Sequence, residues 1–75
     1  MDKEIAQNYI NKLLANERDR MIMALAVNKD KEEAIEVSAT FLDEIFKGYG
    51  FVMAKKMYNS ISFEEIKIAK KIIDY

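Results

Sequence analysis

Apolar residues recur at helical spacing along almost the whole chain. The first segment carries one such stripe, made of Ile5, Tyr9, Ile10, Leu13 and Leu14. Residues three and four apart share a helix face, so this spacing predicts a helix that begins after an Asp2 N-cap. Residues 16–19 (Asn-Glu-Arg-Asp) fit either a kink or a new helix start, because Asn caps helices well and Asp19 stands at the capping-box position. A single helix over residues 3–27 is equally consistent with the pattern.

A second helix is predicted from Asp30 to about Lys47. Asn28 can adopt the left-handed conformation that ends the preceding helix, and Asp30 with Glu33 matches a capping box. Gly48 supplies the C-terminal stop. The residues expected to face inward are Ile35, Ser38, Phe41, Leu42, Ile45 and Phe46.

Two further helices are predicted in the C-terminal part. Residues 51–58 form a short apolar segment that ends at Asn59-Ser60. Ser62 and Glu65 then form the clearest capping box in the chain, and Ile61 can pack on Ile66 as a hydrophobic staple. The last helix places Ile66, Ala69, Ile72 and Ile73 on or near one face.

The pattern therefore predicts an all-α fold. Strand-type alternation is missing, proline is absent, and both glycines lie within residues 47–50. We expect a single domain over residues 1–75, a compact bundle of four to five short helices. So small a chain has little interior, with a net stability of only ~4–11 kcal/mol, so we expect dimerisation or a partner to complete the bundle.

The composition removes most enzyme classes, because the chain has no histidine and no cysteine. These residues carry most nucleophilic chemistry, proton transfer near neutral pH and transition-metal ligation. We expect no enzyme activity, cofactor, metal or small-molecule substrate. The charged N-terminus and a longest apolar run of only seven residues, Met21 to Val27, predict a cytoplasmic protein without membrane contact.

The apolar run at residues 21–27 predicts a second exposed face. Methionine usually fills cores, but positions 21 and 23 cannot share one helix face. With Met21 and Leu25 in the core, Met23 points elsewhere, together with Val27 and Arg20. Such a face suits a dimer seam or a groove for a partner.

The last helix also carries more apolar residues than one face can hold. Ile68 and Ile72 share one face, whereas Ile66, Ala69 and Ile73 share another, and Tyr75 adds to the surplus. A small bundle cannot bury both faces, and surplus exposed apolar area is typical of association.

Tyr49 and Phe51 flank Gly50 in the sequence Lys-Gly-Tyr-Gly-Phe. This segment lacks the spacing of a phosphate-binding loop and no strand precedes it, so we interpret it as a helix end and a tight connection. We expect core packing for the two aromatics. In the alternative, an exposed aromatic at this bend would anchor a partner.

The second helix carries an acidic strip, Glu32, Glu33 and Glu36, followed by Asp43 and Glu44. Paired carboxylates can serve in acid–base chemistry or bind a hard metal, but a helical di-metal site normally adds histidines. A solvated acidic face is the ordinary interpretation. In a third interpretation, the acidic strip is a docking surface that attracts a basic partner.

The charges are divided unevenly, with a net −4 in residues 1–46 and +3 in residues 47–75. A nucleic-acid-binding dimer would use the basic half, through Lys55, Lys56, Lys67, Lys70 and Lys71. Residues 51–75 have the outline of a helix-turn-helix. The second helix begins with Phe63-Glu64-Glu65, however, and its carboxylates would repel DNA phosphates. No arginine follows position 20 to read guanine.

No motif is specific enough to assign a family. The sequence predicts a non-enzymatic protein-interaction module, a regulator, inhibitor or subunit of the kind that phages and mobile elements encode. Its partner would be another protein, a second copy, or both; a nucleic-acid-binding regulator is the alternative. The predicted partner-binding residues are Met23, Val27, Glu32, Glu33, Glu36, Tyr49, Phe51, Ile68 and Ile72.

Overall fold

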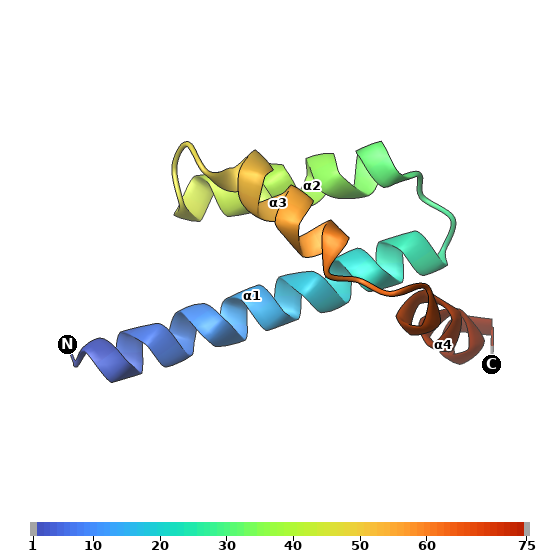
Figure 1. Cartoon of the computed structure of the whole chain (residues 1–75), viewed down its shortest axis with the longest axis horizontal. Helices are drawn as coiled ribbons and strands as arrows, with labels where there is room; N and C mark the ends of the chain where they lie inside the picture. The colour runs from blue at the N-terminus through green and yellow to red at the C-terminus, as the bar shows by residue number, and fades with distance from the viewer. Residues whose placement is uncertain (1, 75) are drawn as a thin grey trace.

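The computed structural model describes residues 2–74, which form four α-helices and no strand. In chain order these are α1 (Lys3–Ala26), α2 (Lys31–Ile45), α3 (Gly50–Asn59) and α4 (Phe63–Asp74). Figure 1 shows α2 and α3 together on one side of α1, and α4 beside the C-terminal part of α1. The predicted all-α helical bundle is confirmed. Tyr75, which the sequence assigned to the surplus apolar surface, lies outside the described residues.

The helix α1 is continuous over 24 residues, so the chain does not break at residues 16–19. Asp2 caps it by accepting a hydrogen bond from the Glu4 N–H at 3.0 Å, and Asn28 follows it with a φ of +70°. At about 36 Å, α1 provides most of the 42 Å long axis of the molecule. Of the two alternatives that the sequence left open for residues 3–27, the structure shows the single long helix, and Glu17 within it is buried.

The helices α2 and α3 form the most closely packed pair. Asp30 caps α2 by accepting from the Glu33 N–H at 2.7 Å. In the connection, the Asp43 carboxylate accepts from the N–H groups of Gly48 and Gly50 at 2.9 and 3.1 Å, and Gly48 has a φ of +87°. Gly50 lies directly against α2, where a Cβ would collide with the Ala39 carbonyl oxygen. The residue that begins α3 must therefore be glycine, because every other residue carries a Cβ.

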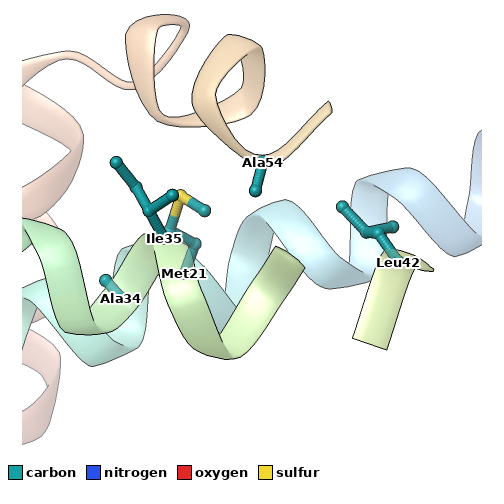
Figure 2. Close-up of a cluster of buried hydrophobic side chains, with 5 residues drawn as sticks. All are labelled: Met21, Ala34, Ile35, Leu42 and Ala54. Atoms are coloured by element: carbon teal, nitrogen blue, oxygen red, sulfur yellow. The ribbon is translucent and has the colours of Figure 1, made fainter. Parts of the chain in front are cut away.

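The core contains two small clusters. The larger joins three helices through Met21 of α1, Ala54 of α3, and Ala34, Ile35 and Leu42 of α2 (Figure 2). The smaller joins α1 to α4 through Ile22, Ala26 and Ala69. Met53, Met57 and Leu25 pack against the larger cluster as partly buried side chains. The expected core role of most methionines is thus confirmed, and Met23 is the exposed exception.

Three residues expected inside are exposed. Ile45 is the last residue of α2, where the following Phe46 takes the packed position and Ile45 stays 44 % exposed. Tyr49 and Phe51 are also exposed, so the expectation that they pack in the core is wrong. Because Gly50 is the residue that lies against α2, the aromatic residues on either side of it stay largely exposed.

The N-terminal turns of α1 extend along the molecule with little cover. Ile5, Tyr9 and Ile10 of the predicted stripe are exposed, whereas Leu13 and Leu14 pack against the core. Within residues 2–74, none of the helices combines the length and the apolarity needed to span a bilayer.

Candidate protein-interaction surface

Three predicted partner-binding residues converge on one apolar groove between α1 and α4. Met23 comes from α1, Ile68 and Ile72 come from α4, and their side chains are 43, 57 and 68 % exposed. The groove has a volume of about 430 Å³, and Ile22 and Ala69 also line it. We call it the α1/α4 groove.

The packing of α4 explains why this groove stays open. Ala69 is buried against Ile22 and Ala26 of α1, with Ile66 partly buried beside them. Ile68 and Ile72 lie on the neighbouring face of the same helix, as their spacing predicts. No Cα of α4 lies within 8 Å of a Cα in α2 or α3, so α1 alone covers α4. One helix cannot cover both apolar faces.

An arginine clamp fixes α4 at this position. The Nη1 and Nη2 of Arg18 donate to the two carboxylate oxygens of Glu65, each at 2.8 Å. The same guanidinium donates from Nε to Ser60 Oγ at 3.0 Å and from Nη2 to the Ser60 carbonyl oxygen at 2.8 Å. Bidentate pairs of this kind fix geometry as well as charge. The clamp therefore sets the direction in which α4 leaves the α3–α4 turn.

Glu65 has a second role at the start of α4. It accepts from the Ser62 N–H at 2.9 Å, while its own N–H donates to Ser62 Oγ at 3.2 Å. This confirms the predicted capping box. The hydrogen bonds from Arg18 and then from the Ser62 N–H lower the pKa of Glu65 to about 2. The carboxylate is therefore charged at neutral pH.

A second apolar groove, which the sequence did not predict, lies between α1 and the end of α2. Tyr9, Ile10 and Leu13 line it from one side, and Ile45 and Phe46 from the other, around a volume of about 410 Å³. The lengths of the helices could have predicted this groove, because a 15-residue α2 cannot cover the whole of a 24-residue α1. A further groove of about 350 Å³ between α1 and α3 contains Leu14, Met53 and Met57.

The other predicted contact residues are divided among separate places. Phe51 lies beside Glu32 and Glu36 in a pocket between α2 and α3, together with Lys31 and Lys55. Glu33 instead faces Lys29, at 3.9 Å. Tyr49 is exposed at the α2–α3 turn, and Val27 is exposed at the C-cap of α1. The acidic strip is therefore mixed with lysines and is not a purely acidic face.

The lysines of the nucleic-acid alternative are carried by two helices that do not pack on each other. Lys55 and Lys56 belong to α3, and Lys67, Lys70 and Lys71 belong to α4. The Lys55 ammonium lies over the Phe51 ring, 5.4 Å from its centre, within the distance of a cation–π contact. Lys67 lies over Phe63 at 5.6 Å and faces Glu64 at 3.8 Å. The two helices of the helix-turn-helix outline, α3 and α4, therefore do not pack against each other.

A buried carboxylate, that of Glu17, is a further feature that the sequence did not predict. Glu17 is only 2 % exposed and accepts hydrogen bonds from Ser38 Oγ at 3.2 Å and Arg20 Nη1 at 3.0 Å. Arg20 stacks over Phe41, 5.5 Å from the ring centre. A cavity of about 140 Å³ adjoins this group. The spacing could have predicted this burial, because Glu17 stands four residues from Leu13 and from Met21 on the inward-facing stripe of α1.

The arrangement of these side chains suits the binding of apolar groups. Among residues 2–74 no group of three or more acidic side chains is placed to hold a metal ion. The α1/α4 groove offers aliphatic and thioether contacts with Asp19 and Glu65 at its edge. No protein-family model, no curated protein and no solved structure matches this chain.

Proposed function

We propose that this chain is a non-enzymatic helical protein-interaction module, which acts as a regulator, inhibitor or subunit by binding protein through the α1/α4 groove. One observation carries the proposal: Met23, Ile68 and Ile72, from two helices, line a single exposed apolar groove. Adjacent exposed apolar side chains mark interaction surfaces, and methionine adapts to the shape of a partner.

The test is a tagged pull-down from source-cell lysate, with and without nuclease, read by mass spectrometry. The wild type is compared with the groove variant Ile68→Glu/Ile72→Glu and with the control Val52→Glu. All three positions are exposed on helices, so the substitutions should leave the fold intact. Circular dichroism checks this.

We expect a protein in stoichiometric amount to be captured by the wild type and the control, with or without nuclease, and lost with the groove variant. Capture that is insensitive to the groove variant would contradict the proposal. Recovery of nucleic acid, with proteins lost on nuclease treatment, would favour the alternative through Lys55, Lys56, Lys67, Lys70 and Lys71.

A further inference from the structure

The molecule exposes more surface than a folded monomer of its size. Its accessible area is 5731 Å², whereas a monomer of 8.7 kDa exposes about 4,700 Å². Its radius of gyration is 13.3 Å, against about 11.3 Å for a compact chain of this length. The surplus of roughly 1,000 Å² is close to the ~800 Å² that each partner buries in a standard interface.

Part of this surplus lies on one face of α1. Tyr9 and Met23 each stand seven residues from Asn16, and Ile5 and Val27 each stand eleven residues from it. Seven and eleven residues are close to two and three helical turns, so all five positions point in nearly the same direction. All five are exposed. We call them the α1 outer face.

This face has the symmetry that a two-fold axis requires. In a two-fold interface the same patch occurs on both partners, so residue i of one meets residue j of the other and the reverse. Two antiparallel α1 helices with the axis at Asn16 place Tyr9 opposite Met23 of the second copy. They also place Ile5 opposite Val27. Every apolar residue of the face then meets an apolar residue.

The charges beside the face agree with the same pairing. Lys12 and Asp19 lie on one edge of the α1 outer face, four residues before Asn16 and three residues after it. In an antiparallel pair, each edge meets the same edge of the second copy. Lys12 of each chain therefore lies beside Asp19 of the other. Two ion pairs, each between a lysine of one copy and an aspartate of the other, therefore lie on either side of the two-fold axis.

The neighbouring helices leave room for this partner. Met23 and Asp19 border the α1/α4 groove, whereas Tyr9 and Asn16 border the groove at the end of α2. The α1 outer face thus lies between α4 and α2. The N-terminal turns of a second α1 would run along the α1/α4 groove, beside Ile68 and Ile72.

We infer that the occupant of the α1/α4 groove is a second copy of this chain, paired antiparallel through the α1 outer face. The inference rests on the proposed function, because it names the protein that fills the groove. In the dimer the N-terminal turns of α1 pack against α4 of the partner copy. The two otherwise uncovered apolar regions cover each other.

Sedimentation equilibrium of the purified full chain tests this inference. We expect a dimer for the wild type and for the control Val52→Glu, and a monomer for Tyr9→Glu. Lys12→Asp alone and Asp19→Lys alone should each weaken the dimer about tenfold or more, because each places like charges opposite each other. Mixing the two single variants should restore the dimer, since both pairs then have opposite charges.

A monomeric wild type at millimolar concentration would overturn the inference, as would a dimer that Tyr9→Glu leaves intact. Failure of the mixed variants to associate would overturn the antiparallel pairing. A monomer that still captures a different protein through the groove would overturn the self-pairing but support the proposed function. A dimer whose groove variant captures the same proteins as the wild type would contradict the proposed function alone.

Discussion

Arg18 of α1 donates hydrogen bonds to both carboxylate oxygens of Glu65 of α4, each at 2.8 Å, although the two residues are 47 positions apart in the sequence. The same guanidinium also holds the Ser60 carbonyl oxygen at the turn before α4. Because α4 packs on α1 alone, this contact and the small Ile22, Ala26 and Ala69 cluster together hold α4 in place.

Replacing Arg18 by Met should loosen α4 selectively. The variant keeps an apolar stem but removes the guanidinium hydrogen bonds to Glu65 and Ser60. We expect faster amide hydrogen exchange throughout α4, with α2 unchanged, because α2 does not pack on α4 and Arg18 makes no hydrogen bond to it. Lys67→Met is the matched control, since it removes only exposed contacts within α4, to Glu64 and to the Phe63 ring. Uniformly faster exchange in all four helices would contradict this view.

The same pair predicts a specific loss of stability in acid. The pKa of Glu65 is about 2 in the folded chain, below its ordinary 4.5, because Arg18 stabilises the charged form. A depressed folded-state pKa gives stability that is present above pH 4.5 and lost as the pH falls from about 4.5 to about 2. Urea unfolding of the wild type and Glu65→Gln across this range is the measurement. Glutamine can still return the capping-box bond through its carbonyl oxygen, so the variant keeps the cap while it removes the charge and one of the two acceptors for Arg18.

We expect the wild type to be more stable than Glu65→Gln at neutral pH and the difference to vanish near pH 2. Other carboxylates titrate in both proteins and cancel in the comparison. A difference that stays constant with pH would show that the charge of Glu65 does not contribute.

Gly50→Ala should destabilise the fold by about 1–3 kcal/mol, because its methyl group would overlap the α2 backbone. The nearest atoms include the Ala39 carbonyl oxygen and the Asp43 Cβ, the latter at 2.6 Å. Gly48→Asn is the control: it lies in open space, and asparagine tolerates the left-handed conformation found there. Chemical denaturation measures both. Equal losses of stability in Gly50→Ala and Gly48→Asn would contradict the close approach of α3 to α2.

Ser38→Ala should cost about 1–3 kcal/mol, since it removes a hydrogen-bond donor from the buried Glu17 carboxylate. Thr40→Ala is the control on the same helix, where the hydroxyl is exposed and donates only to the Glu36 carbonyl oxygen. Thermal unfolding of both variants checks this. A loss as large in Thr40→Ala would show that removing a hydroxyl from α2 is costly in general and that the contact with Glu17 is not the cause.

The sequence predicted the helix ends well. Asp2, Asp30 and the Ser62–Glu65 pair cap the helices as their spacing indicates, and Asn28 adopts the left-handed conformation. These features depend on atoms two to four residues apart, so the local sequence contains all the necessary information. It also separated Met21 from Met23 and the two apolar faces of the last helix, because helical periodicity alone fixes which residues share a face.

Only the tertiary structure decided which faces remain open. Within the continuous α1, the buried Glu17 carboxylate accepts a hydrogen bond from Ser38 of α2, a contact between different helices that local sequence does not indicate. The exposure of Tyr49 and Phe51 follows from the contact of Gly50 with α2. The α1/α4 groove follows from the position of α4, which the hydrogen bonds between Arg18 and Glu65 fix. The sequence by itself determined the helices, their caps and their amphipathic faces through local interactions. Their pairing depends on contacts between residues far apart in the chain, and that pairing decided which apolar residues are covered.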